Sequence, residues 1–405
     1  MRTLPLLLAA LVALPASAQD WTTVPVGTPN TLRQFEIASF SNLHLVGDGG
    51  VVVIGLPPYT TWTPEPIGTS ENLTGILRPT ATQIWIAGDN GVVRVRDTQG
   101  NWLNRNIPTA ETLVLSSRAS GEAIAYGSGG GIWYSDDLGA TWVPQTSGTS
   151  ATLRNAIGGT GPTGVAVGDG GIILRTTDQG ATWTPIPSGT TADLYDIAYI
   201  GSGMGVVGAD GTILRSFDDG LSWTPEVSPV PVTLRALDTS GANVFFHLAV
   251  GDSGTVLTSR DNGDTWCVLP TGSTEDFWTA EMVTNSLFLV AGTNGTLLKT
   301  ESGGGGCTPV ATETLPRAEI ALSAVWPNPV RTEATLTLRL DAPRDLRVTI
   351  LDARGREIRV IHEGTLPSSA AVPLALDVSG LTPAPYTVRV EGDGVRDSRP
   401  FVVVR

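Results

Sequence analysis

Residues 135–142 read Ser-Asp-Asp-Leu-Gly-Ala-Thr-Trp, and the pattern Ser/Thr-x-Asp-x-Gly-x-Thr/Ser-Trp returns at 176–183, 216–223 and 259–266. The chemistry of this pattern is structural, because an Asp carboxylate accepts backbone N–H groups, Gly permits a tight bend and Trp covers the turn. We call the four copies the Asp turns. They predict one structure that is repeated four times. Its structural residues are Asp137, Asp178, Asp218 and Asp261, together with Trp142, Trp183, Trp223 and Trp266.

The Asp turns belong to a longer repeat of about 40 residues. Trp residues at 21, 62, 102, 142, 183, 223 and 266 are spaced by 41, 40, 40, 41, 40 and 43 residues. A Gly that ends an apolar run forms a second series, at 47, 88, 127, 168, 208, 251 and 292. Each unit contains four short strand patterns separated by turn residues, which is typical of a propeller blade. Two series of seven therefore predict a seven-bladed β-propeller in an all-β protein.

The two ends of the repeat region are complementary fragments. Residues 20–24 have the pattern of a fourth strand without the three before it, whereas the last unit, through Lys299, has three strands and no Trp strand. A solenoid, the competing architecture, would carry capping units at its ends. We therefore expect the N-terminal strand to complete the seventh blade and to remove its exposed edge.

The Asp turns resemble the Asp-box, or BNR, repeat of sialidases, sortilins and related propellers. The 40-residue period, with its Leu-Arg starts and Gly-Asp-Gly-Gly turns, is most similar to the photosystem II stability/assembly factor family over residues 20–300. That resemblance implies a seven-bladed scaffold that holds a protein partner and has no catalytic activity. It says nothing about which partner this chain binds, because a fold does not fix a function.

The chain begins like a secreted protein. Arg2 precedes an apolar run from Leu4 to Leu14 and a small-residue segment ending at Ala18, which predicts a signal peptide over 1–18. No later run is long enough to span a membrane. Export makes a disulfide between Cys267 and Cys307 reasonable, and its loop of about 40 residues corresponds to roughly 4 kcal/mol in the chain-entropy model. Two free thiols are the alternative.

A different module follows a Gly/Pro/Thr linker over 303–318. Residues 319–405 carry alternating strand patterns, which predict a small β-sandwich. This module resembles the type A sorting domain of the type IX secretion system. Four features carry the resemblance, in the order of that family: Pro-Asn-Pro at 327–329, Asp-x-x-Gly-Arg at 352–356, Leu-x-x-x-x-Tyr at 381–386 and a basic C-terminus. The resemblance implies contact with that machinery, passage across the outer membrane, and then removal of the tail or attachment to the surface. An ordinary sandwich that binds carbohydrate or acts as a spacer is the alternative.

Charge separates the two parts. The chain carries 25 Lys and Arg against 39 Asp and Glu, a net charge of −14. Residues 313–405 hold 12 Arg and 12 acidic residues, whereas residues 19–312 hold 12 basic and 27 acidic residues. The acidic propeller, expected over 19–302, argues against a nucleic-acid partner. With three His and no clustered Cys, we expect no metal site and no cofactor.

The candidate binding site is one position of the repeat. The second residue of each first strand should lie at the mouth of the central channel, next to the turn between the second and third strands. Arg, Tyr and Trp are favoured anchors of protein partners. The five such residues predict a site for a protein or glycan: Arg33, Arg154, Tyr195, Arg235 and Trp278. Two alternatives remain: the Arg residues pair with turn Asp residues and link neighbouring blades, or the same ring serves a sialidase-like hydrolase or a lectin.

Overall fold

The structure is a computed structural model that describes residues 21–404 apart from several short segments. The segments outside the description are 40–41, 81–82, 98, 118–121, 159–161, 202, 240–245, 262, 304–319, 323–324, 326–329, 341–342, 353–355, 368 and 393–394. The predicted signal peptide, most of the linker, Cys307, the Pro-Asn-Pro motif and part of the Asp-x-x-Gly-Arg motif lie there. The chain forms two compact units, one made mostly of residues before 311 and the other mostly of residues from 311 onward.

The first unit contains seven four-stranded sheets, which form the seven blades of a β-propeller. Blade 1 comprises β2 (Leu32–Ser39), β3 (Asn42–Gly47), β4 (Val51–Gly55) and β5 (Trp62–Pro64). Blade 2 comprises β6 (Leu73–Thr80), β7 (Gln83–Gly88), β8 (Val93–Arg96) and β9 (Trp102–Asn104). Blade 3 comprises β10 (Leu113–Ser117), β11 (Ala123–Gly127), β12 (Ile132–Ser135) and β13 (Val143–Gln145). Blade 4 comprises β14 (Leu153–Gly158), β15 (Gly164–Gly168), β16 (Ile173–Thr176) and β17 (Thr184–Pro185).

The remaining blades follow the same order. Blade 5 comprises β18 (Leu194–Ile200), β19 (Gly203–Gly208), β20 (Ile213–Ser216) and β21 (Thr224–Pro225). Blade 6 comprises β22 (Leu234–Asp238), β23 (His247–Gly251), β24 (Val256–Ser259) and β25 (Cys267–Val268). Blade 7 comprises β26 (Phe277–Met282), β27 (Phe288–Gly292), β28 (Leu297–Thr300) and β1 (Thr22–Thr23). Short 3₁₀ turns follow the second strands of five blades: η1 (Asp48–Gly50), η2 (Asp89–Gly91), η3 (Asp169–Gly171), η4 (Ala209–Gly211) and η5 (Thr293–Gly295).

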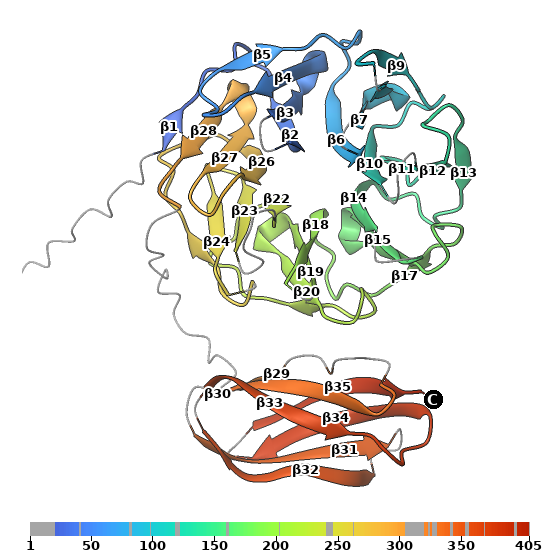
Figure 1. Ribbon diagram of the computed structural model, residues 1–405, viewed down its shortest axis with the longest axis vertical. Helices are drawn as coiled ribbons and strands as arrows, with labels where there is room; N and C mark the ends of the chain where they lie inside the picture. The colour runs from blue at the N-terminus through green and yellow to red at the C-terminus, as the bar shows by residue number, and fades with distance from the viewer. Residues whose placement is uncertain are drawn as a thin grey trace, which may run out of the picture. The chain divides into compact units, whose positions relative to one another are not determined.

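The first strand of every blade is innermost, and each contacts the first strands on both sides of it (Figure 1). The N-terminal strand β1 closes the ring, because it pairs with β28 through Thr22 opposite Lys299 and Thr23 opposite Leu298. Lys299 strengthens this junction: its ammonium donates to Pro58 O in blade 1 at 2.8 Å. The predicted closure by an N-terminal strand is therefore confirmed.

The repeated Trp residues hold neighbouring blades together. Each packs in an apolar cluster formed by its own blade and the preceding one; Trp223, for example, joins residues of blades 4 and 5 and is 8% exposed. Burying a large aromatic side chain is among the strongest stabilising contributions in a core. The seven junctions contain, in ring order from blades 7 and 1 onward, Trp62, Trp102, Trp142, Trp183, Trp223, Trp266 and Trp21.

The Gly that ends each second strand is required by a close backbone approach. Gly47 has extended backbone angles, but a Cβ added to it would lie 2.2 Å from Thr31 O. The equivalent Gly residues of five other blades would place a Cβ 1.8–2.4 Å from the matching carbonyl oxygen. In blade 3 a Cβ on Gly127 would instead meet the Glu111 carboxylate at 2.0 Å. In the other six blades no side chain fits where the second strand passes the start of the first.

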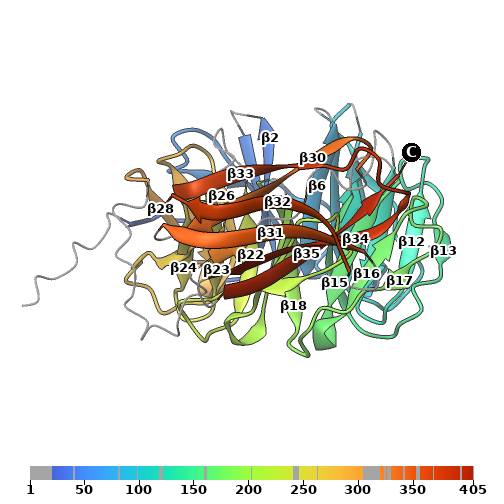
Figure 2. The same cartoon turned by 90° about the horizontal axis from the view of Figure 1, so that it is seen from below.

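Residues of the C-terminal unit form a β-sandwich, with a three-stranded sheet β29-β30-β33 and a four-stranded sheet β32-β31-β34-β35. Figure 2 shows these strands running along roughly one direction. Both sheets contribute to one core that includes Leu336, Val348 and Phe401. The strands are β29 (Ile320–Leu322), β30 (Glu333–Leu340), β31 (Arg344–Asp352), β32 (Glu357–Leu366), β33 (Ser369–Asp377), β34 (Ala384–Gly392) and β35 (Val395–Val403).

Two details of the sandwich go beyond its sequence pattern. Strand β32 is an edge strand, and half of its residues are exposed, including Ile358 and Val360. The Leu-x-x-x-x-Tyr motif forms a corner in which the Tyr386 hydroxyl donates to Thr382 O at 3.0 Å. Tyr386 also stacks on Phe401, with ring centroids 5.8 Å apart. The motif thus fixes the entry of β34 into the core.

Candidate functional site

A β-bulge positions the predicted site residues at the channel mouth. In blade 1, Leu32 lies opposite Gly47 and Gln34 lies opposite Val46, so Arg33 is an extra residue without a partner in the ladder. A bulge changes the direction of the extra side chain and is common next to binding sites. The same register shift occurs in blades 2, 4, 5, 6 and 7 and places these residues in the bulge: Thr74, Arg154, Tyr195, Arg235 and Trp278.

Each of the three Arg side chains is paired with an Asp of its own blade. Arg33 binds Asp48 with two hydrogen bonds, Nε to Oδ1 at 2.8 Å and Nη2 to Oδ2 at 3.0 Å. The other two pairs use Nε: Arg154 donates to Asp169 Oδ1, and Arg235 donates to Asp252 Oδ1 at 2.5 Å. The alternative in which each Arg pairs with the Asp that follows a second strand is therefore present, but each pair lies within one blade and does not link two blades.

Contacts between blades come from stacking. The guanidinium carbon of Arg33 lies 4.1 Å from the centroid of the Trp278 ring, and that of Arg235 lies 4.2 Å from the same ring. Tyr195 has Arg154 at 4.5 Å and Arg235 at 5.5 Å. The five side chains alternate in one continuous stack over blades 4, 5, 6, 7 and 1, which we call the mouth ladder: Arg154, Tyr195, Arg235, Trp278 and Arg33. The structure thus brings together all five residues of the predicted site.

Blades 2 and 3 interrupt the ladder. The Thr74 hydroxyl donates to Leu113 O at 2.5 Å. Val114 pairs regularly with Tyr126, without a bulge, and packs against the apolar cluster between blades 3 and 4. The 3₁₀ turn of blade 5 differs from those that supply an Asp to an Arg. Its Asp210 occupies the middle of the turn, with φ of 54°, and Ala209 takes the position of the Asp that pairs with Arg in other blades.

Polar side chains just inside the mouth connect blades 4, 5, 6 and 7. Asp196 of blade 5 accepts hydrogen bonds from the Asn155 amide of blade 4 and, at 2.7 Å, from Leu237 N of blade 6. Asp238 accepts from Met282 N of blade 7 at 2.5 Å. Burial raises the pKa of Asp196 to about 6, although these hydrogen bonds stabilise its charged form. The sequence pattern had assigned no role to these residues, since their partners lie about one repeat away.

Two further groups of ionisable residues, partly or fully buried, have shifted pKa values. Glu36 follows Arg33 along β2; burial raises the pKa of Glu36 to about 7, and the nearby Arg78 opposes this shift. Between blades 5 and 6, Arg215 is only 1% exposed and interacts with Glu226, whose pKa burial raises to about 7. His247 lies beside Arg215, and burial lowers the pKa of His247 to about 4. Both groups contribute to contacts within the ring rather than to an open site.

The Asp turns have the geometry of a structural motif. In blade 3, Asp137 Oδ1 accepts from Thr141 N at 2.9 Å, and its Oδ2 accepts from the Thr141 hydroxyl at 2.6 Å. These hydrogen bonds lower the pKa of Asp137 to about 2. Gly139 N donates to Ser135 Oγ at 2.9 Å, and Gly139 itself has φ of 72°. Asp178, Asp218 and Asp261 make the same hydrogen bonds, so each carboxylate is engaged by its own turn.

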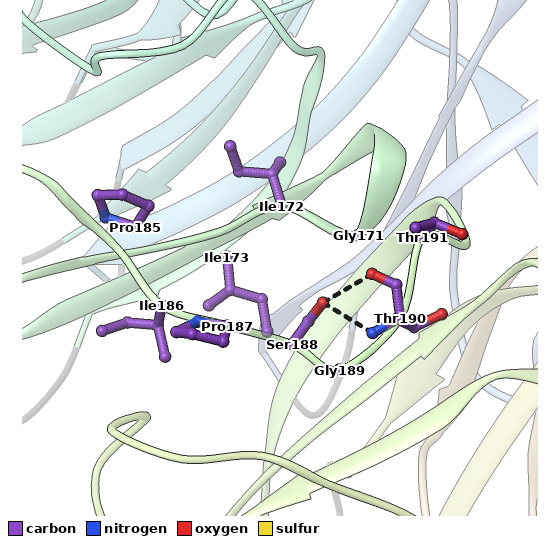
Figure 3. A pocket seen from close by; sticks show the side chains of 10 residues that line it. All are labelled: Gly171, Ile172, Ile173, Pro185, Ile186, Pro187, Ser188, Gly189, Thr190 and Thr191. Carbon is purple, nitrogen blue, oxygen red and sulfur yellow. Dashed lines mark hydrogen bonds between the residues drawn. The ribbon is translucent and has the colours of Figure 1, made fainter.

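A shallow surface pocket lies beside blade 4, where the chain leaves β17 for blade 5 (Figure 3). Its volume is about 870 Å³. Among its lining residues, Ser188 Oγ donates to Thr190 O at 3.1 Å and accepts from Thr190 N at 3.3 Å. Ser147 and Thr149 make the same contacts in the preceding link. The pocket is thus a feature of the repeat, and it holds no charged side chain. Its lining residues are Gly171, Ile172, Ile173, Pro185, Ile186, Pro187, Ser188, Gly189, Thr190 and Thr191.

Within the described residues, no group of three or more His, Cys, Asp or Glu side chains has an arrangement that could hold a metal ion. Among the same residues, no helix is long and apolar enough to cross a membrane. Cys267 opens β25 at the outer edge of blade 6. Its pairing with Cys307 stays a prediction, and intact-mass measurement before and after reduction would check it.

The fold defines the class of protein: a seven-bladed β-propeller, here with a stack of Arg and aromatic side chains on its innermost strands, followed by a sandwich. Residues 324–404 match the family model described as the secretion system C-terminal sorting domain. This match confirms the type IX sorting domain predicted from the tail, and such a domain directs export to the cell surface or beyond it. No curated protein matches the chain.

Solved structures that resemble the chain are propellers. YCF48 bound to D1 peptide is 18% identical, with a TM-score of 0.59, and covers 70% of this chain and 97% of its own. YCF48 from Cyanidioschyzon merolae is 16% identical, with a TM-score of 0.57, and covers 69% of this chain and 98% of its own. The WD40 propeller domain of Doa1 is 11% identical, with a TM-score of 0.57, and covers 70% of this chain and 97% of its own. At these identities the likeness concerns the fold, and it confirms the predicted similarity to photosystem II assembly-factor propellers at that level.

Proposed function

We propose that this protein is a secreted or cell-surface scaffold without catalytic activity, whose propeller binds a protein partner at the mouth ladder. The observation that supports this proposal most directly is the ladder itself. It aligns three guanidinium groups and two aromatic rings on bulged strands, and its Arg side chains remain 16–30% exposed. Fixed Arg and aromatic side chains are the groups that most often anchor protein partners.

Export belongs to the same proposal. A signal peptide removed near Ala18 would deliver the chain to the periplasm, and residues 319–405 would then engage the type IX secretion machinery. The linker over 303–318 would separate the propeller, over 19–302, from the sorting sandwich. Deleting residues 319–405 should leave the propeller in the periplasm. Normal surface delivery of the shortened chain would contradict this part of the proposal.

The peptide in the YCF48 structure supports a protein partner rather than a glycan. YCF48 is described as bound to D1 peptide, so a propeller of this fold accepts a peptide. A glycan-directed hydrolase or lectin would need exposed aromatic faces for sugar rings. In the mouth ladder each aromatic ring already contacts two guanidinium groups. Robust turnover in a fluorogenic glycosidase screen, or strong binding on a glycan array, would favour the alternative.

The test of the binding site compares two matched Arg residues in the full-length chain. Arg235→Gln removes the guanidinium that contacts both aromatic rings, and we expect capture of surface proteins by the chain to fall at least tenfold. Arg96→Gln is the control. Arg96 also stacks on a Trp, at 5.9 Å from Trp102, and pairs with Glu65 at 3.3 Å, but it lies on the third strand of blade 2. Equal capture by both variants and the unmodified chain would overturn the proposed site.

A further inference from the structure

We propose that the partner supplies an aromatic side chain that stacks on the free face of Arg154, in the break of the mouth ladder at blades 2 and 3. This inference rests on the proposed function and specifies its chemistry. The ladder alternates guanidinium and aromatic groups, and it ends in a guanidinium at both ends, Arg154 and Arg33. An aromatic group is therefore the next member of the series on either side of the break.

Arg154 is held in a position suited to this contact. Its Nε donates to Asp169, and one face of its guanidinium lies over the Tyr195 ring at 4.5 Å. Among the described residues no second ring stacks on it, whereas Arg235 lies between two rings. Its side chain is 30% exposed, more than the 23% of Arg33 or the 16% of Arg235. Arg154 thus offers a fixed guanidinium that is partly exposed and that, within the described residues, stacks on one ring alone.

The two blades of the break contribute small or apolar groups at this level. Thr74 directs its hydroxyl to Leu113 O, and Val114 is half-buried against the cluster between blades 3 and 4. Gly75 follows Thr74, and a Cβ added there would meet no atom closer than 3.5 Å. These residues place no charge and no planar group opposite Arg154. They suit an apolar ring better than a carboxylate or a hydrated sugar.

Electrostatics favours an aromatic ring over an anion. The charge of Arg154 is already balanced by Asp169, so a carboxylate would gain little from the guanidinium and would approach a second carboxylate. The quadrupole of an aromatic ring is attracted by the guanidinium face, while the Arg–Asp pair is retained. Sugar stacking needs a free aromatic face, which the ladder does not present. A Trp, Tyr or Phe side chain of a protein partner meets these conditions.

Nuclear magnetic resonance of the full-length chain with N-acetyltryptophanamide tests the contact directly. An indole on the free face of Arg154 should shift the Nε–H signal of Arg154 upfield by its ring current. The Arg235 signal should move much less, because both of its faces already lie next to rings, and N-acetylleucinamide should shift neither. An Arg154 shift no larger than that of Arg235, or an equal effect of the leucine probe, would overturn the inference.

A second variant separates this inference from the proposed function. Val114→Trp adds a ring of the chain's own to the break without changing a ladder residue, and Val114→Ile is its control. We expect Val114→Trp to shift the Arg154 signal without any probe and to reduce partner capture at least tenfold. Capture that depends on Arg235 but tolerates Val114→Trp would refute the aromatic contact and leave the proposed site standing. Capture that tolerates both changes would refute the site itself.

Discussion

The two ends of a blade use the same side chain, Asp, in different ways. In an Asp turn, Asp137 accepts hydrogen bonds from Thr141, four residues further along the chain. At the channel mouth, Asp169 accepts from Arg154, 15 residues earlier, and Arg154 stacks on Tyr195 of the next blade. The four Asp turns are nearly identical, whereas the mouth residues differ from blade to blade.

This difference separates framework from site. An Asp turn is complete within eight residues, so each copy stabilises its own blade and can repeat without change. The mouth ladder exists only when five blades stand side by side, and its variation leaves two blades without a stacking residue. Positions that carry the same residue in many blades thus stabilise the fold. Positions that vary from blade to blade form the mouth ladder, which spans five of the seven blades. The predictions that follow test this division.

Replacing a Trp of the framework should have the largest effect. Trp223→Ala empties part of the core between blades 4 and 5, and we expect the propeller to lose about 3–5 kcal/mol in its free energy of unfolding. Trp278→Ala at the mouth should cost only about 1–2 kcal/mol, because Trp278 is half-buried and stacks on two Arg groups. Equilibrium denaturation of both variants measures the two losses. Similar losses would show that the mouth ladder is part of the framework.

The raised pKa of Glu36 should make stability depend on pH. The pKa of Glu36 is about 7 in the folded protein, whereas an unperturbed Glu side chain has a pKa of 4.5, so folding favours the protonated form of Glu36. The contribution of Glu36 to the free energy of unfolding is complete below pH 4.5 and is lost as the pH rises through 7. This loss amounts to about 3 kcal/mol. Glu36→Gln should therefore reduce the fall in melting temperature between pH 5 and 8. Asp196 and Glu226 have raised pKa values too, so part of the fall should remain.

The control for this pH effect is Glu357→Gln, which changes an exposed carboxylate of the sandwich. It should leave the pH dependence of the propeller transition as it is in the unmodified chain. A Glu36→Gln variant with an unchanged pH profile would show that Glu36 titrates in the folded chain as it does in the unfolded one.

Loss of one hydroxyl in an Asp turn should have an intermediate effect. Thr176 is 1% exposed, and its hydroxyl accepts from Gly180 N at 2.8 Å. Thr176→Val preserves the shape but leaves this buried N–H without its acceptor, which costs about 1–3 kcal/mol. Thr184→Val, at an exposed position of the adjacent strand, should be nearly neutral. Chemical denaturation distinguishes them, and equal stability of the two variants would contradict a structural role for the turn hydroxyl.

The smallest effect on stability should come from the mouth pairs. Asp169→Asn keeps the shape of the side chain and removes its charge; the partly exposed pair with Arg154 should contribute less than about 1 kcal/mol. We expect an almost unchanged melting temperature together with weaker partner capture, because Arg154 loses the group that orients it. A large fall in melting temperature with full capture would reverse the assignment of framework and site.

The repeat made the predictions of the fold accurate, whereas the contacts of the candidate site depend on positions a repeat cannot relate. Arg33 and Trp278 are predicted as members of one ring, yet their stacking joins the first and last blades of the propeller. Asp196 is invisible in the pattern, because its partners Asn155 and Leu237 each lie 41 residues away.

The amino-acid sequence by itself determined the number of blades, the Asp turns, the closing strand and the sorting sandwich. These features follow from a period of about 40 residues and from interactions between residues close in the chain, so their patterns are readable one unit at a time. Only the tertiary structure decided the bulges that direct side chains into the mouth, the order of the ladder and its break at blades 2 and 3. The bulges depend on how two strands of one blade pair, and the ladder requires neighbouring blades to meet, because a stack of guanidinium and aromatic groups has no local signal. Its contact between Trp278 and Arg33 also requires the closed ring.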